Sequence, residues 1–151
     1  MTNHKQRLNI LGAVQLTPGG QRVHLQVQTL RHSLKGEQVL AFLKRLLARV
    51  RGPIVLVWDN AAIHVRRLVV DFIAAHSRVS LVHLPSYAPE LNPVELVWAQ
   101  LTQYLAGRAP RDLEALMQLV QAGLHRTRRS QRRLLACLHA TPLNWRGIGV
   151  K

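Results

Sequence analysis

The run Ile-Val-Leu-Val-Trp at residues 54–58 narrows the range of possible folds more than any other segment. Three of its five residues are β-branched, the turn-forming pair Gly52-Pro53 precedes it, and Asp59-Asn60 follows it. A continuous apolar run of this length is typical of a strand that is buried on both faces of a sheet. The run therefore predicts a sheet whose two faces are covered by helices.

The segments around this strand alternate between strand and helix periods. Runs at 8–16 and 22–30, separated by Thr-Pro-Gly-Gly-Gln, predict a β-hairpin with His24 on its polar face. The later elements that the spacing predicts are helices over 37–50 and 64–76, a strand over 79–84, a helix opened by Pro93 with Asn92 as its cap, and helices near 111–127 and 130–139. This order predicts an α/β fold in which a mixed sheet is covered by helices and followed by a helical tail.

The chain carries a large excess of positive charge, with 21 Lys and Arg against 7 Asp and Glu and a formal net charge of +14. Seventeen of the 21 cations are Arg, whose planar guanidinium suits bidentate contacts with phosphate. We therefore expect a polyanionic partner, a nucleic acid, with a solvated basic surface as the alternative. The arginines that we expect to contact it are Arg66, Arg67, Arg126, Arg128, Arg129, Arg132 and Arg133.

Cysteine and histidine usage excludes several classes of protein. The single cysteine, Cys137, rules out an internal disulfide and a cysteine-rich zinc module, and we expect it to fill the core. The eight histidines show no spacing with Cys or Asp that would form a zinc site. Because the chain shows neither a signal-peptide pattern nor an apolar run long enough to cross a bilayer, we expect a cytoplasmic, nucleoid-associated protein that does not bind membranes.

Two of the seven acidic residues occupy positions suited to catalysis. Asp59 follows the apolar strand, and catalytic groups gather at the carboxyl ends of strands in an open α/β sheet. Glu95 lies in the first turn of the helix that Pro93 opens. Each acid also has a structural alternative, since Asp59 could cap the turn into the next helix and Glu95 could form a capping box with Asn92.

Two blocks of sequence, VWDNAAIH at 57–64 and LVHLPSYAPELNPVELVW at 81–98, resemble the DDE-type transposases of the mariner-like superfamily. Within that superfamily they resemble the bacterial insertion-sequence branch. The first block matches at Asp59, Asn60 and His64, and the 35 residues between Asp59 and Glu95 agree with the family's separation of its second and third catalytic acids. The second block matches at Leu84, Pro85, Tyr87, Pro89, Glu90, Leu91, Asn92, Pro93, Glu95 and Trp98.

The resemblance covers about residues 8–108 and implies a ribonuclease H-like fold with metal-dependent DNA cleavage and strand transfer in DNA transposition. It implies that Asp59 and Glu95 hold Mg²⁺ or Mn²⁺ in a two-metal site, and hard oxygen ligands suit these ions. Asn60 and His64 are expected to support the site by hydrogen bonding or by orienting DNA or a carboxylate. For His64, a local hydrogen bond without a role in the site is the alternative.

The chain departs from this family at the first of its three catalytic acids. No Asp or Glu precedes Glu37, so the carboxylate that the family places on a strand before the hairpin is missing. In the implied sheet that strand lies between the hairpin and residues 54–58, so its loss predicts either an unpaired strand edge or a direct pairing. We therefore expect residues 1–108 to form a partial ribonuclease H-like catalytic domain and residues 109–151 to form a basic helical tail.

Three functions fit these observations. The first is a transposase catalytic segment that is incomplete alone, and the second is a catalytically inactive, nonspecific DNA-binding remnant of a transposase. The third is a different ribonuclease H-like nuclease acting on RNA or DNA, which the Pro-Glu-Leu-Asn-Pro block disfavours. As partners we expect DNA, with the product of an upstream reading frame and a second copy of the chain on DNA as further candidates. Whether the chain is an active enzyme stays open.

Overall fold

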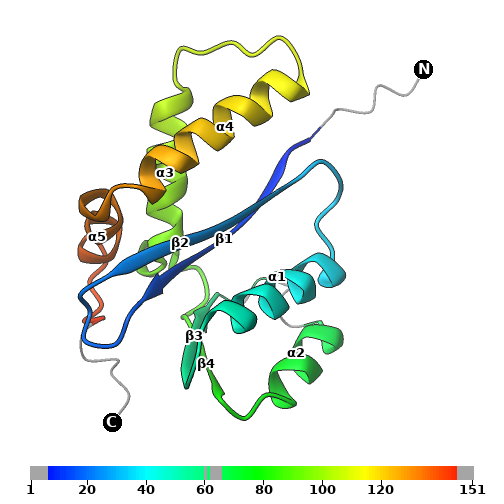
Figure 1. Cartoon of the computed structure of the whole chain (residues 1–151), viewed down its shortest axis with the longest axis vertical. Coiled ribbons are helices and arrows are strands. Elements are labelled where there is room, and N and C mark those ends of the chain that lie inside the picture. The colour runs from blue at the N-terminus through cyan, green and yellow to red at the C-terminus, as the bar shows by residue number, and fades with distance from the viewer. Residues whose placement is uncertain (1–6, 60, 62–65, 146–151) are drawn as a thin grey trace. The chain divides into compact units, whose positions relative to one another are not determined.

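The computed structural model describes residues 7–59, 61 and 66–145 (Figure 1). They form two compact units, of which the first combines residues 7–33 with 93–145 and the second contains the described residues from 34 to 92. The boundary predicted between a catalytic domain and a helical tail, at residues 108 and 109, lies within the first of these units. It stays a prediction. None of the described helices combines the length and hydropathy that a membrane span requires.

The first unit begins with the predicted antiparallel hairpin, formed by β1 (Asn9–Leu16) and β2 (Val23–Leu30). The two strands pair along their whole length, so the turn between them occupies only residues 17–22. In this turn Gly19 and Gly20 have φ angles of +83° and +69°, a backbone region that glycine occupies without steric cost. The turn therefore depends on the two glycines of the Thr-Pro-Gly-Gly-Gln segment.

Three helices pack on this hairpin (Figure 1), and they are α3 (Pro93–Leu105), α4 (Leu113–Arg128) and α5 (Gln131–His139). Val23 and Leu25 of β2 are buried in the core that they share with these helices, whereas His24 between them is exposed, as predicted. Cys137 is buried in the same core, which confirms its predicted place. The remaining buried members of this core are Val97, Leu101, Val120, Leu124, Leu134 and Leu138.

Side-chain caps mark the beginnings of the last two helices. The Asp112 carboxylate accepts a 2.8 Å hydrogen bond from a first-turn N–H of α4, and the Ser130 hydroxyl accepts one of 3.2 Å in α5. The side-chain amide of Gln131 then donates to the Val23 carbonyl and accepts from the Val23 N–H. The predicted helical tail is thus hydrogen-bonded to β2 and packs in the same unit as the hairpin.

The second unit contains the predicted alternation of strands and helices. Its elements are α1 (Gly36–Arg49), β3 (Ile54–Trp58), α2 (Arg67–Ala74), β4 (Val79–His83) and the short 3₁₀ helix η1 (Pro89–Leu91). β3 and β4 run parallel, and the Arg78 guanidinium before β4 donates hydrogen bonds to the carbonyls of Leu47, Val50 and Gly52. These bonds satisfy carbonyls at the end of α1 and fix the entry into β4.

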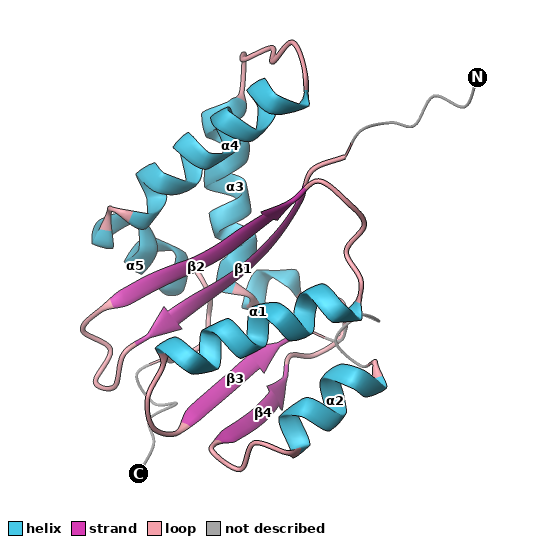
Figure 2. Ribbon diagram, turned by 45° about the vertical axis from the view of Figure 1, so that its right-hand side comes forward, coloured by secondary structure: helices cyan, strands magenta, loops and turns pink. Residues whose placement is uncertain are grey.

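The observed sheets differ from the predicted one in two respects. Only Trp58 of β3 is buried, and residues 54–57 are partly exposed, so the prediction of a strand buried on both faces is wrong. In the described part of the chain the expected mixed sheet is divided into two two-stranded sheets, β1–β2 antiparallel and β3–β4 parallel (Figure 2). A strand with one neighbour has an unpaired edge, which accounts for the exposure of β3. Of the two alternatives predicted for the missing strand, the unpaired edge is observed.

Candidate active site

Asp59 is the first residue after β3, at the carboxyl end of the parallel strand pair. It is partly exposed, and its Oδ1 atom accepts a 3.1 Å hydrogen bond from the Ala61 N–H. This bond forms an Asx turn, so Asp59 does cap the turn that follows the strand. The Ala61 N–H occupies one of the about four lone-pair sites of the carboxylate. Capping the turn does not by itself prevent Asp59 from binding a metal ion.

The loop that follows β4 lies at the same edge of this sheet. Trp58 and His83 are partners in the parallel register, and the Leu84 N–H donates a 2.8 Å hydrogen bond to the Trp58 carbonyl. Asp59 and Leu84 are therefore the next residues on neighbouring strands. Three residues further on, Tyr87 is fully exposed and has a φ angle of +59°. The sequence singled out Tyr87 only as a motif match, because neither its backbone conformation nor its exposure has a local sequence signal.

Glu95 lies in the first turn of α3, in the first unit, and its side chain is exposed. Within the described residues its carboxylate has no hydrogen-bond or ion-pair partner, so the capping box with Asn92 is not formed. The helix beneath it is closely packed, because Val97 is fully buried and Trp98 lies against β1 where Gly12 has no side chain. Among the described residues Glu95 is thus a carboxylate without a partner, and its helix is anchored in the core through Val97 and Trp98.

Gln100 connects α3 to both later helices. Its Nε2 atom donates to the Arg133 carbonyl and to Cys137 Sγ, each at 3.2 Å, and its Oε1 atom accepts a 3.2 Å hydrogen bond from Thr127 Oγ1. Thr127 is only 4% exposed, so this bond satisfies a buried hydroxyl. This network has no local sequence signal, because a lone glutamine in an apolar stripe does not reveal its partners on other helices.

The two predicted catalytic acids belong to different units, Asp59 to the second and Glu95 to the first. The predicted supporting residues Asn60 and His64 lie outside the described residues. In the part of the chain that the structure describes, no group of three or more His, Cys, Asp or Glu side chains could hold a metal ion. Mg²⁺ is usually bound by one or two carboxylates, with water and substrate phosphates completing its shell, so each of these acids is a ligand of the kind that such an ion prefers.

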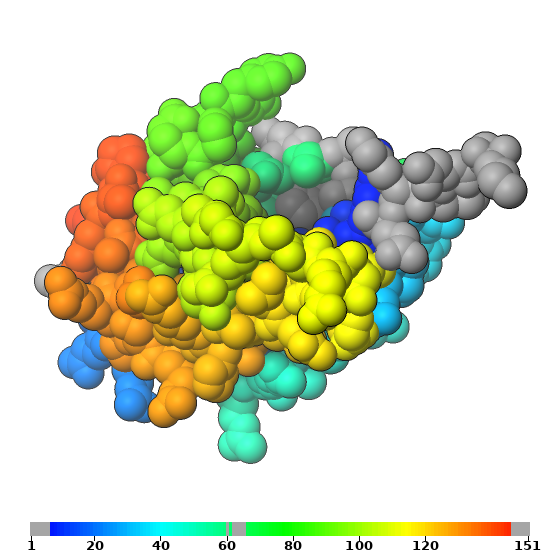
Figure 3. All heavy atoms as spheres, turned by 90° about the horizontal axis from the view of Figure 1, so that it is seen from above, coloured from blue at the N-terminus to red at the C-terminus, as the bar shows by residue number. Residues whose placement is uncertain are grey.

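Five of the seven arginines predicted to contact DNA lie around the junction of α4 and α5, and they are Arg126, Arg128, Arg129, Arg132 and Arg133. The outer surfaces of these helices form one face of the first unit, coloured yellow to orange in Figure 3. Arg128 differs from its neighbours, because its Nε atom donates a 3.2 Å hydrogen bond to the Leu25 carbonyl of β2. Part of its guanidinium is therefore committed to the fold, although Arg128 is exposed as a residue, as are Arg126, Arg129 and Arg132.

The other two predicted DNA contacts, Arg66 and Arg67, lie at the start of α2 in the second unit and are exposed. Arg67 Nε lies 3.5 Å from Asp71 Oδ2, one helical turn further on. Exposed ion pairs of this kind contribute little to stability, so phosphate can compete with Asp71 for Arg67.

Tyr104 holds two arginines against its ring. The guanidinium carbon of Arg108 lies 4.4 Å from the ring centroid, and that of Arg126 lies 5.8 Å from it. Arg108 Nε also donates a 2.7 Å hydrogen bond to the Tyr104 carbonyl. Arg108 is not among the arginines predicted to contact DNA, although its spacing of four residues from Tyr104 is a usable signal. Arg108 adds a positive charge to the surface that carries Arg126.

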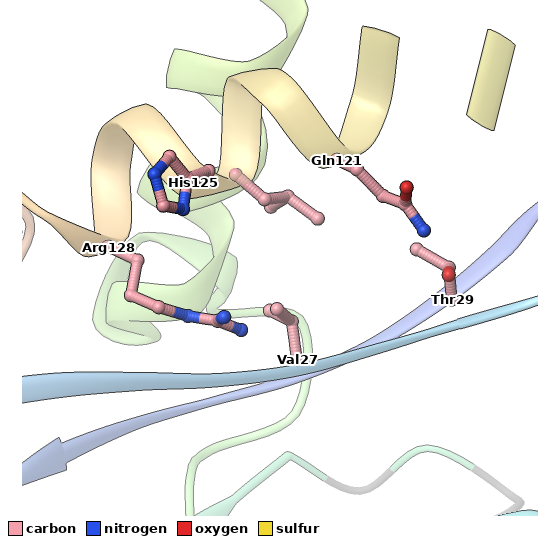
Figure 4. A pocket seen from close by; sticks show the side chains of 6 residues that line it. Val27, Thr29, Gln121, His125 and Arg128 are labelled. Carbon is pink, nitrogen blue, oxygen red and sulfur yellow. The ribbon is translucent and has the colours of Figure 1, made fainter. Parts of the chain in front are cut away.

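A cavity of about 430 Å³ lies between α4 and β2 in the first unit (Figure 4). Its lining residues are Val27 and Thr29 from β2 and Gln121, Leu124, His125 and Arg128 from α4. Neither predicted catalytic acid lines it, and Arg128 is its one predicted DNA contact. The cavity is thus separate from the predicted metal ligands.

Residues 1–117 match the sequence profile of a family described as DDE superfamily endonuclease. No curated protein sequence matches the chain significantly. The matched range contains both predicted catalytic acids and extends into α4.

Three solved structures of Mos1 share the fold. The catalytic domain of Mos1 mariner transposase has a TM-score of 0.53 and 13% identity, over 89% of this chain and 83% of that chain. The same catalytic domain with raltegravir and Mn has a TM-score of 0.54 and 16% identity, over 90% and 84%. The Mos1 strand transfer complex has a TM-score of 0.50 and 19% identity, over 82% of this chain and 41% of that chain. At these identities the similarity is one of fold, and it confirms the predicted ribonuclease H-like architecture.

Proposed function

The chain belongs to the DDE superfamily endonuclease family, and on this premise we propose that it is a transposase catalytic segment that cleaves and joins DNA with divalent metal ions. The observation that supports this most is the placement of the two motif carboxylates on regular elements. Asp59 follows the carboxyl end of β3, and Glu95 lies in the first turn of the closely packed helix α3. Within the family, the two sequence blocks favour the bacterial insertion-sequence branch.

In this proposal Asp59 and Glu95 hold Mg²⁺ or Mn²⁺. When bound, such ions activate the attacking water or 3′-hydroxyl and stabilise the leaving oxygen of the phosphodiester. The Ala61 N–H orients the Asp59 carboxylate within the second unit, and the packing of α3 holds Glu95 in the first unit. Asn60 and His64 are proposed to support the site.

DNA is the proposed partner, and the arginines are the proposed contacts. The exposed guanidinium groups around the junction of α4 and α5 suit phosphate oxygens, and those of Arg66 and Arg67 add contacts on the second unit. The similarity to a structure named as a strand transfer complex supports the same partner. A second copy of the chain on DNA is a further candidate partner. Contacts of this kind go to the backbone, so they position DNA without reading its sequence.

Nicking of supercoiled plasmid DNA tests the proposal, with the full chain and the product of the upstream reading frame present together, because that product is the candidate source of the missing first carboxylate. We expect nicking in Mg²⁺ or Mn²⁺ and none in EDTA, and we expect Asp59→Asn and Glu95→Gln to reduce it to background. Both changes remove a negative charge but keep the size of the side chain, and Asn at 59 can still accept the hydrogen bond that closes the turn. The matched control is Glu37→Gln, which removes an exposed acid from the first turn of α1 and should leave nicking unchanged.

Nicking that survives both substitutions would overturn the assignment of Asp59 and Glu95. The alternative function, an inactive DNA-binding remnant, predicts binding without nicking in either metal. Its binding should weaken with salt along a log–log slope of about −4.5 if five arginines each contact one phosphate.

A further inference from the structure

Tyr87 combines two features that oppose folding. Among the described residues it is the only residue other than glycine with a positive φ angle, at +59°. In this left-handed region the Cβ atom of a bulky residue lies too close to the backbone, which makes an aromatic side chain unfavourable there. Its ring is also fully exposed, although an aromatic ring stabilises a fold mainly when it is buried. Tyr87 thus stabilises the fold neither through its backbone nor through its side chain.

The surrounding loop holds this conformation in place. Hydrogen bonds from the Leu91 N–H to the Ala88 carbonyl and from the Asn92 N–H to the Pro89 carbonyl close the short helix η1 directly after it. On the other side, the Leu84 N–H anchors the loop to the end of β3. A strained residue between two anchored segments points to a role in binding, because the rest of the loop maintains the strain.

The position of Tyr87 relates it to the predicted metal ligand of the second unit. Asp59 and Leu84 extend neighbouring parallel strands at one sheet edge, and Tyr87 lies three residues beyond Leu84 in the loop at that edge. Ligands of α/β sheets bind outside the carboxyl ends of the strands. The neighbours of the ring in the loop, from Pro85 to Glu90, include no large apolar side chain, which differs from the apolar surroundings of a protein-binding anchor.

We propose that Tyr87 is a stacking platform for an unpaired nucleobase of the DNA strand bound at the Asp59 edge of the β3–β4 sheet. The inference rests on the proposed function, since it takes DNA as the ligand. A phenol ring offers a π face to any base, so the contact tolerates every sequence and requires a base that is free of its partner. A ring held in the left-handed conformation is already extended into solvent and loses little freedom when the base stacks on it.

A double-mutant cycle, which removes the ring from Tyr87 and the bases from the DNA, tests this inference. The full chain and its Tyr87→Gly and Tyr87→Phe variants are titrated in EDTA, by fluorescence anisotropy, with a single-stranded oligonucleotide and with an abasic strand of the same length. Glycine removes the ring and accepts the positive φ angle, and phenylalanine keeps the ring. We expect Tyr87→Gly to weaken binding of the normal strand by about fivefold to a hundredfold. Binding of the abasic strand should not change, and Tyr87→Phe should bind both strands as the wild type does.

Thermal unfolding separates this role from a structural one. Because glycine relieves the backbone strain and removes an exposed ring, Tyr87→Gly should unfold at the same or a higher temperature than the wild type. A lower unfolding temperature, an equal loss of affinity for both strands, or no loss at all would each overturn the inference. Failure of the proposed function has other signatures, since a chain that does not act on DNA would bind neither strand, whereas the inactive remnant would bind DNA without nicking a plasmid.

Discussion

Substitution of Gly12 by alanine should destabilise the protein, although alanine is usually the better residue within a strand. A Cβ atom at this position would lie 2.6 Å from Trp98 Cη2 and 2.9 Å from Trp98 Cζ2, well inside the 3.5–4.0 Å that two carbon atoms prefer. Overpacking of this kind costs about 1–3 kcal/mol. Replacing a strand glycine recovers about 0.5–1 kcal/mol. We therefore expect a net loss of up to about 2.5 kcal/mol, which corresponds to at most about 10 °C in the unfolding temperature of a chain this long.

Urea and thermal unfolding followed by circular dichroism measure this loss, and a second background isolates its cause. In Trp98→Leu the side chain is shorter, so Gly12→Ala should there be neutral or stabilising, and the difference between the two backgrounds is the coupling energy of the contact. An equal loss in both backgrounds, or a higher unfolding temperature for Gly12→Ala alone, would refute the clash. Because Trp98 and Glu95 are on the same helix, the single variant should also lower plasmid nicking.

Two further predictions concern the core of the first unit. Gln100→Ala removes the acceptor of the buried Thr127 hydroxyl, so it should lower the free energy of unfolding in urea by about 1–3 kcal/mol. The double variant Gln100→Leu with Thr127→Val leaves no buried hydroxyl unpaired, so it should be less destabilised than Gln100→Ala. An additive loss in the double variant would count against the network. Burial raises the pKa of the Cys137 thiol, so the thiol is protonated at pH 8. Iodoacetamide reacts with the thiolate and should therefore modify Cys137 only after unfolding. Rapid modification of the folded chain, monitored by mass spectrometry, would contradict this.

Local sequence features located the two predicted catalytic acids, but they did not reveal the contacts that these acids and Arg128 make. Both acids were found from their neighbours in the sequence, because a strand end and a helix start are local features. The alternatives for the two acids were decided by geometry, since Asp59 accepts the hydrogen bond of a turn whereas Glu95 makes none within the described residues. The commitment of Arg128 to the Leu25 carbonyl joins residues 103 positions apart, which no local pattern predicts.

The sequence by itself determined the elements and their order. Glycines at a turn, the two hydrophobic periods and the helix caps act within a few residues, so the hairpin, the two later strands and the α-helices that the structure describes were predicted close to their observed bounds. The tertiary structure decided how these elements combine. The exposure of residues 54–57 depends on which strands lie beside β3, and the fit of Trp98 against Gly12 depends on a helix and a strand far apart in the chain. Periodicity shows that a face is apolar, whereas its burial depends on the partner that long-range packing provides.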